Sequence, residues 1–267
     1  MIELPAVAWG VLTVGALLVG VAKTALPGLA TLAVAAYATV LPARESTAAL
    51  LVLLLAGDLV AIWAYRRDCD FTTLRRLLPA VLAGVVLGAA FLAFADNTTM
   101  RRTIGVILLA LTALTLWGMR RGLDSAAAQG PWAQAGYGAL GGFTTMAANS
   151  GGPVMTLYFL AARFDMMRFL GTQAWFFFLV NIAKLPFSLG LGLLATDMLT
   201  PLLLLVPVTL SGAWLGRRGD RRGRRRLSGR RPVARRPRRH RPHDLAGLTG
   251  PTASRRGGAC DPSAQQV

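Results

Sequence analysis

The chain has 267 residues, of which 54% are hydrophobic, and its mean hydropathy is +0.50. This composition is too apolar for a soluble domain of that size, and several apolar runs are long enough to cross a bilayer. The formal net charge of +17 is concentrated at one end, because residues 217–267 hold 16 of the 29 Lys and Arg residues. The sequence therefore predicts an all-α polytopic membrane protein with a nearly neutral body.

Apolar segments separated by charged turns follow one another along the chain. They predict helices at residues 5–22, 26–41, 47–65, 78–95, 102–118, 132–148, 153–162, 169–195 and 198–216. The segment 153–162 is too short to span, because a transmembrane helix needs about 20 apolar residues. It is expected either to enter the membrane and turn back or to form half of a broken helix. A sharp turn is also required before residue 26.

The two halves of the chain share a pattern of Pro, Gly and Leu. Pro5, Gly10, Gly15 and Pro27 recur 126 residues later as Pro131, Gly136, Gly141 and Pro153. Pro79, Leu82, Gly84, Leu87 and Gly88 recur 128 residues later as Pro207, Leu210, Gly212, Leu215 and Gly216. Paired halves of apolar helices interrupted by Pro and Gly are typical of secondary transporters. We therefore expect two transmembrane repeats, residues 1–119 and 131–216, joined by a linker at 120–130. The glycines of the second set are interpreted as packing residues.

The charged connections predict how the helices cross the membrane. Cytoplasmic loops carry the excess of Lys and Arg. Alternate connections place the Arg-containing segments 66–76, 120–130 and 163–168 on one side, against Arg44, Arg101 and Arg102 on the other. The first side is predicted to be cytoplasmic, together with residues 217–267, and the N-terminus to lie outside. Five passes in the first repeat would make the second repeat inverted.

The inverted repeat predicts a helix near residues 229–247, as the partner of residues 101–119, but the sequence there is rich in Arg and Pro. The last helix is then missing, and residues 217–267 are predicted to be disordered. A genuine basic tail would bind anionic lipid headgroups. A frameshift is the other explanation, because Arg, Gly, Pro and Ala, which have GC-rich codons, make up 33 of the 51 residues after Gly216. Nucleic acid is not an expected partner, since no aromatic residue lies among the basic ones.

A Gly-rich turn in the second half carries a family resemblance. The segment 141–153 (GGFTTMAANSGGP), the matching turn that ends at Pro27, the repeated Pro-x-x-Leu-x-Gly-x-x-Leu-Gly pattern and the Ala-Arg-Phe at 162–164 resemble the sulfite exporter TauE/SafE family of membrane permeases over residues 5–216. The resemblance implies a carrier of the bacterial inner membrane for small anions such as sulfite, sulfoacetate or related organosulfur and carboxylate compounds. The first turn, residues 20–27, departs from the Gly-rich pattern of the family, which leaves the exact substrate open.

Two helix starts inside the membrane predict an anion site. A helix N-terminus offers unpaired N–H groups and the positive end of the helix dipole, and Gly151 and Gly152 would let a ligand approach the backbone. Lys23 occupies the position equivalent to Asn149. The alternative is that the glycines serve only tight helix packing. The substrate-binding candidates are Lys23, Thr24, Pro27, Asn149, Ser150, Gly151, Gly152, Pro153, Thr172, Gln173 and Asn181.

Two ionisable residues, Asp58 and Lys184, lie inside predicted membrane helices. Charged residues are costly there and are usually functional. They are interpreted as proton-coupling candidates, and their opposite charges suggest that they pair. A buried carboxyl can hold a proton near neutral pH, which makes Asp58 the better proton carrier. The alternative is a structural hydrogen bond to a neighbouring helix.

The leading hypothesis is a secondary carrier of small anions that works by alternating access in a lipid bilayer. An enzyme is not expected, because residues 1–216 contain no His and a single Cys, which leaves no nucleophile–base pair. For the same reason no metal and no cofactor are expected. The alternative function is a non-transporting or degenerate membrane scaffold with a basic lipid-binding tail. Assembly as a homo-oligomer would cover the face left open by the missing helix.

Overall fold

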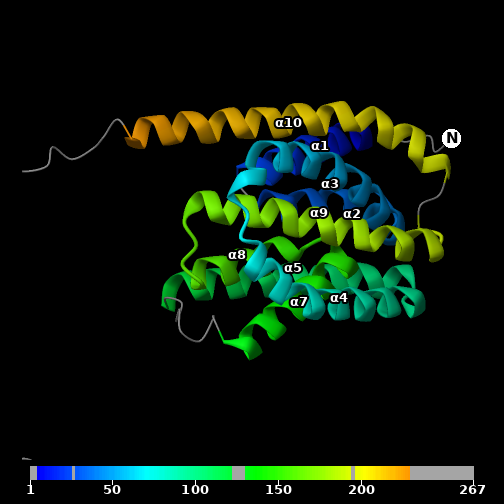
Figure 1. The fold of residues 1–267 in the computed structure, drawn as a ribbon. Coiled ribbons are helices and arrows are strands. Elements are labelled where there is room, and N and C mark those ends of the chain that lie inside the picture. The colour runs from blue at the N-terminus through cyan, green and yellow to red at the C-terminus, as the bar shows by residue number, and fades with distance from the viewer. Residues whose placement is uncertain (1–4, 26–27, 122–129, 194–195, 229–267) are drawn as a thin grey trace, which may run out of the picture. The chain divides into compact units, whose positions relative to one another are not determined.

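The computed structural model describes residues 5–25, 28–121, 130–193 and 196–228. All regular structure in this part of the chain is helical (Figure 1). The α-helices are α1 (Ala6–Thr24), α2 (Leu29–Val40), α3 (Ala43–Tyr65), α4 (Phe71–Phe94), α5 (Asn97–Arg121), α7 (Pro131–Ala148), α8 (Gly151–Ala161), α9 (Met166–Gly190) and α10 (Thr196–Ser228), with a short 3-10 helix, η1 (Arg66–Asp68), after α3. The predicted all-α class is confirmed.

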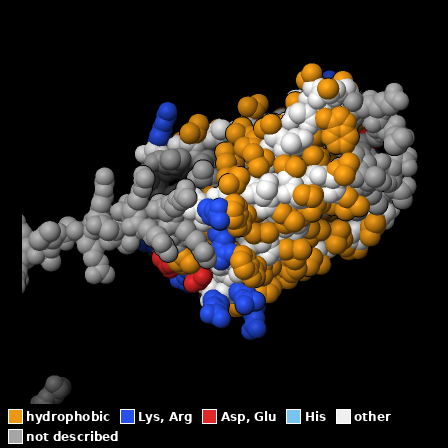
Figure 2. Space-filling model, turned by 90° about the horizontal axis from the view of Figure 1, so that it is seen from above, with side chains coloured by type: hydrophobic (Ala, Val, Ile, Leu, Met, Phe, Trp, Pro, Cys, Tyr) orange, Lys and Arg blue, Asp and Glu red, His pale blue; other side chains and the backbone are white. Residues whose placement is uncertain are grey.

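The outside of the helical bundle is hydrophobic. Large apolar side chains point outward, among them Val7 at 79% exposure, Phe94 at 91% and Leu109 at 75%. Figure 2 shows a broad hydrophobic face with Lys and Arg side chains gathered at one end. Four helical segments of the described chain, α1, α3 with η1, α4 and most of α5, are long and apolar enough to cross a membrane. Soluble monomers rarely expose so much apolar surface, so the chain is a polytopic membrane protein.

Two short helices fold back along the helices that precede them. α2 has 12 residues and α8 has 11, lengths of about 18 and 16 Å at 1.5 Å per residue, whereas the hydrocarbon core is about 30 Å thick. The Tyr37 hydroxyl of α2 donates to the carbonyl of Leu12 in α1 (3.0 Å). The rings of Tyr137 in α7 and Tyr158 in α8 lie 5.6 Å apart. We call α1 with α2 the first hairpin and α7 with α8 the second hairpin. Of the two arrangements predicted for residues 153–162, the structure therefore shows the one in which the segment turns back.

Glycines bring two pairs of long helices into backbone contact. A Cβ atom on Gly84 of α4 would lie 2.1 Å from the carbonyl oxygen of Ala139 in α7. A Cβ atom on Gly212 of α10 would lie 2.4 Å from the carbonyl oxygen of Leu17 in α1. Any side chain would force these helices apart, so small residues are required, as is usual where membrane helices cross closely. The remaining glycines of the repeated motif are similarly enclosed: Gly88 and Gly216.

Three helices begin at least four residues earlier than their apolar runs predict. α3 starts at Ala43 rather than residue 47, α4 at Phe71 rather than residue 78, and α5 at Asn97 rather than residue 102. The Asp70 carboxylate accepts hydrogen bonds from the backbone N–H groups of Thr72 (3.0 Å) and Thr73 (3.2 Å). Such an N-cap satisfies donors that the first turn leaves free, so α4 begins within the polar segment.

Two helices also cross the boundaries predicted between domains. α5 extends to Arg121, into the predicted linker 120–130, of which residues 122–129 lie outside the described residues. α10 continues to Ser228, so the segment predicted to be disordered from residue 217 begins as a helix. Residues 229–267 lie outside the described residues, and the frameshift hypothesis stays a prediction.

Replacing Gly142 by Ala should destabilise the bundle, because the new Cβ would lie 2.1 Å from the carbonyl oxygen of Val81. Overpacking of this kind typically costs about 1–3 kcal/mol. Gly136 in the same helix has nothing within 4 Å of its Cβ position, so Gly136→Ala is the matched control and should be neutral or slightly stabilising. Thermal unfolding in detergent measures the difference. Equal Tm values for the two variants would contradict the described packing.

Candidate functional site

A narrow cavity lies where the two hairpins meet α3 and α9. Its volume is about 30 Å³, room for one or two water molecules. Ala30 and Gly152, the second residues of α2 and α8, both line it. The N-terminal turns of both short helices therefore border the same cavity, and the anion site stays a prediction. The polar side chains that line it are Lys23, Asp58, Thr145, Asn149, Gln173 and Asn181.

Lys23 and Asp58 form an ion pair at this cavity. Lys23 Nζ lies 2.6 Å from Asp58 Oδ1, and the two side chains are 8% and 0% exposed. The Lys23 ammonium also lies 4.7 Å from the ring centre of Phe177 in α9. Lys23 comes one residue before the end of α1, and Asp58 lies within α3. A buried pair adds little net stability, but loss of either partner leaves an uncompensated charge, so the pair fixes the end of α1 against α3.

Lys184 of α9 is held by two amide oxygens. Its Nζ donates to Asn149 Oδ1 and lies 3.5 Å from Asn181 Oδ1. Each amide is fixed from its other side, because Asn149 Nδ2 donates to the carbonyl of Thr47 (2.9 Å) and Asn181 Nδ2 donates to Asp58 Oδ2 (2.7 Å). Both amides therefore present an oxygen to Lys184, an arrangement that suits an ammonium group. We call Lys23, Asp58, Asn149, Asn181 and Lys184 the charged cluster.

The direct pair of Asp58 with Lys184, expected from their opposite charges, is replaced by the pair with Lys23. Asn181 lies between Asp58 and Lys184 and bonds to both. The sequence contains a signal for this arrangement, because Asp58 and Lys184 are 126 residues apart, as are Lys23 and Asn149. The contact of Lys23 with Asp58 in the first half thus corresponds to that of Asn149 with Lys184 in the second half.

Three of the predicted site residues serve helix packing. The Thr24 hydroxyl donates to the carbonyl of Ala213 in α10 (2.8 Å). The Thr172 hydroxyl accepts from the backbone N–H of Asp70, outside the cavity (2.9 Å). A Cβ atom on Gly151 would lie 2.9 Å from a carbonyl oxygen of α7, so this glycine packs the second hairpin.

The turn between α7 and α8 holds two further features that bear on ligand binding. Asn149 ends α7 in the left-handed conformation, with φ of 49°, which Asn tolerates better than most residues. Ser150 follows and is buried, and its Oγ, like the Oε1 of Gln173 in the cavity, has no hydrogen-bond partner within the described residues. Buried polar atoms normally find partners, so both oxygens are exceptions, and that of Gln173 belongs to a residue lining the cavity. Pro153 is half-buried in α8, and Pro27 lies outside the described residues.

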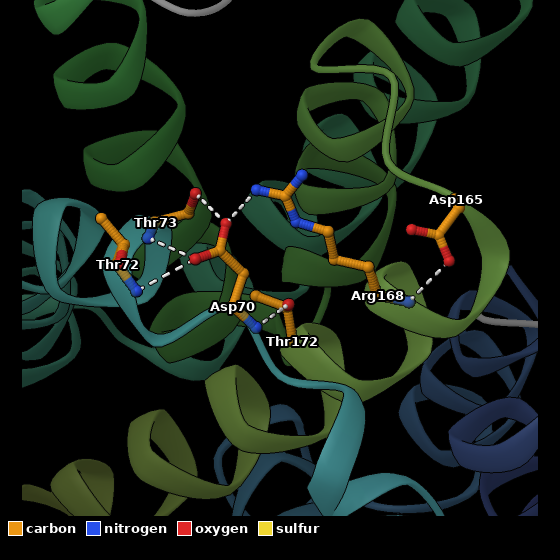
Figure 3. A network of polar contacts seen from close by, with 6 residues as sticks. All are labelled: Asp70, Thr72, Thr73, Asp165, Arg168 and Thr172. Atoms are coloured by element: carbon orange, nitrogen blue, oxygen red, sulfur yellow. Dashed lines mark hydrogen bonds and ion pairs between the residues drawn. The ribbon is translucent and has the colours of Figure 1, made fainter.

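A second polar network lies outside the cavity, where α9 begins (Figure 3). Arg168 of α9 forms an ion pair with Asp70, whose carboxylate also accepts from the Thr73 hydroxyl (2.6 Å). Asp165 caps α9 by accepting from the backbone N–H of Arg168 (3.2 Å). Partial burial raises the pKa of Asp70, but hydrogen bonds from Thr73 and Arg168 outweigh it and hold the pKa at about 2. This network ties the start of α9 to the connection between α3 and α4.

The lipid-facing bundle and its buried charged cavity define a polytopic membrane protein of the transporter class. The chain belongs to the sulfite exporter TauE/SafE family, whose model matches residues 12–230. No curated protein and no solved structure matches the chain. Membership confirms the resemblance seen in the sequence and identifies the chain as a membrane transporter by family.

The network around Asp70 should make the thermal stability of the protein fall at acidic pH. The pKa of Asp70 is lower in the folded chain than the value of about 3.9 for a free Asp, so its contribution is present above about pH 4 and lost as the pH falls towards 2. The fall in Tm over this range should be smaller in Asp70→Asn than in the unchanged protein. At neutral pH, Arg168→Gln should lower Tm in detergent, whereas Arg163→Gln, an exposed control on the same turn, should not. Equal losses in the two Arg variants would contradict the network's role.

Proposed function

We propose that this transporter is a secondary carrier of small anions and that its substrate binds in the cavity beside the charged cluster. The observation that carries the proposal is the charge balance of the cluster. It contains two ammonium groups, Lys23 and Lys184, and one carboxylate, Asp58. A net charge held away from water is expensive. A bound anion would compensate the remaining positive charge, whereas a cation would add to it.

The size of the cavity supports a small substrate. The cavity of about 30 Å³ holds one or two water molecules, so sulfite or a comparably small oxyanion requires the side chains around it to move. Lys23 is the side chain best placed to do so, since an incoming anion would replace the Asp58 carboxylate as its partner. Sulfite, sulfoacetate and related organosulfur or carboxylate compounds remain the candidate substrates, with donors from Lys23 and the start of α8.

The pairing of helices supports two inverted repeats that work by alternating access. α1 packs along α10, and α4 packs along α7. Because α1 corresponds to α7 and α4 to α10 in the repeat, exchanging the halves converts one pair into the other, as a twofold axis requires. α3 and α9, which correspond to each other, pack together beside the cavity. Rocking of one half against the other would then expose the cavity to each side in turn.

The distribution of Arg and Trp supports the proposed orientation in the bacterial inner membrane. Arg217 lies 4.1 Å from the ring centre of Trp63, and Arg218 lies 3.2 Å from that of Trp214. Trp side chains gather at membrane interfaces, and cytoplasmic ends carry excess Arg. The end of α3 and the charged turn before α9 lie at this same end, where the Trp175 indole donates to the carbonyl of Arg66 (3.4 Å). We therefore propose that this end is cytoplasmic and that the N-terminus lies outside.

The proposal is tested by anion flux in reconstituted vesicles loaded with sulfite. The unchanged protein should exchange internal sulfite for external radiolabelled sulfite. Lys23→Gln should lower the flux about tenfold or more, since a hydrogen bond to a charged group contributes about 1.5–3 kcal/mol. Arg67→Gln, an exposed change outside the cavity, is the control and should keep the flux. Full flux in Lys23→Gln would contradict the site, and absence of flux for sulfite, sulfoacetate and small carboxylates would favour the scaffold alternative.

Proton coupling through Asp58 is part of the proposal. A proton on Asp58 would release Lys23 for the anion, which links the two binding events. In Asp58→Asn, an inward proton gradient should therefore no longer stimulate uptake, while exchange at equal pH should continue. Vesicles loaded with sulfite, with and without the gradient, measure both. Stimulation that persists in Asp58→Asn but is lost in Lys184→Gln would assign the proton to Lys184 instead.

A further inference from the structure

The two halves of the chain contribute different charges to the charged cluster at corresponding positions. In the first half, Lys23 and Asp58 compensate each other at 2.6 Å. In the second half, the corresponding positions hold Asn149 and Lys184, a neutral amide and a cation. The charged cluster therefore keeps one positive charge for which the described residues supply no carboxylate.

Two amide oxygens accept hydrogen bonds from Lys184, an arrangement that suits an ammonium group. Lys184 is 1% exposed, so bulk water does not compensate it. Asn149 and Asn181 are turned towards it by partners on their far sides, the carbonyl of Thr47 and the carboxylate of Asp58. Amide oxygens stabilise an ammonium group through their dipoles, but they do not cancel its charge.

We infer that this carrier is an obligatory anion exchanger and that Lys184 imposes the exchange; the inference rests on the proposed function. Alternating access requires an intermediate in which the cavity is closed to both sides. In that intermediate the uncompensated charge of Lys184 is cut off from water, which is costly in a low-dielectric interior. With Asp58 ionised, a bound monovalent anion, such as hydrogen sulfite or a small monocarboxylate, brings the cluster to zero charge; with Asp58 protonated, a divalent anion such as sulfite does so. The loaded carrier therefore passes through the closed state and the empty carrier does not.

Lys184→Gln should convert exchange into net transport. The substitution removes the excess positive charge and leaves the pair of Lys23 with Asp58 in place, so the empty cavity becomes neutral and can close. Lys184→Arg keeps the charge and should keep the requirement for exchange. This is a gain of net flux, and loss of a merely structural contact would not produce it.

The test uses vesicles loaded with radiolabelled sulfite and diluted into one of two media. One medium contains unlabelled sulfite, and the other contains gluconate in its place. The membrane potential is clamped so that charge movement does not limit efflux. In the unchanged protein, external sulfite should speed efflux about tenfold or more, since tenfold corresponds to about 1.4 kcal/mol between the two closing steps. We define the exchange ratio as the efflux rate with external sulfite divided by the rate without it. In Lys184→Gln this ratio should fall to near one, because efflux into sulfite-free medium becomes faster. Lys184→Arg should retain the original ratio.

Each result decides between specific statements. A ratio near one in the unchanged protein, with measurable efflux, would overturn obligatory exchange but leave the carrier proposal intact. A high ratio that persists in Lys184→Gln would overturn the role of Lys184. No sulfite efflux under either condition would overturn the carrier proposal for sulfite and the exchange inference together. The ratio in the unchanged protein tests exchange even where Lys184→Gln fails to fold.

Discussion

The bundle is organised around buried charged side chains. In a medium without water, an ammonium group and a carboxylate must lie in contact, and Lys23 and Asp58 meet this requirement at 2.6 Å. The contact joins the end of α1 to the middle of α3, and the Tyr65 hydroxyl adds a bond to the carbonyl of Thr24 beside it (2.9 Å). The position of the first hairpin therefore depends on electrostatics as much as on apolar packing. Asn181 extends the same network to Lys184 on α9.

Close helix crossings make this polar interior possible. Short helices such as α2 and α8 leave backbone groups unpaired within the membrane, which is tolerated only where protein or a water-filled cavity surrounds them. Glycines at the α1–α10 and α4–α7 contacts bring the helix backbones together and surround the hairpins with protein. Ala30 of α2 and Gly152 of α8, each the second residue of its helix, then lie at the cavity. The same close crossings therefore exclude lipid and position residues that line the cavity.

The sequence predicted much of this fold but less of the site. Apolar run length was sufficient to identify the short segment at 153–162, and the repeated glycines identified close helix crossings. The start of α4 was missed because it depends on a side-chain cap at Asp70, which precedes the apolar run. Thr24 and Thr172 were assigned to the cavity because a membrane helix is apolar on all sides, so its sequence does not tell which face points inward. The partner of Asp58 lay on another helix, and only the three-dimensional placement, or the repeat offset extended to α3 and α9, could reveal it.

In the proposed mechanism, the difference between the two halves of the chain matters more than their similarity. If the second half repeated the ion pair of the first, the cavity would contain two compensated pairs and would have no electrostatic need for a ligand. With Asn at 149 and Lys at 184, the corresponding positions hold a cation that donates to two amide oxygens. In the proposed mechanism, the start of α8 and the unpartnered oxygen of Gln173 at the cavity would supply further polar groups for orienting an anion and its protonated oxygen. The duplicated scaffold would then provide the movement, and the different residues at two corresponding positions would require an anion.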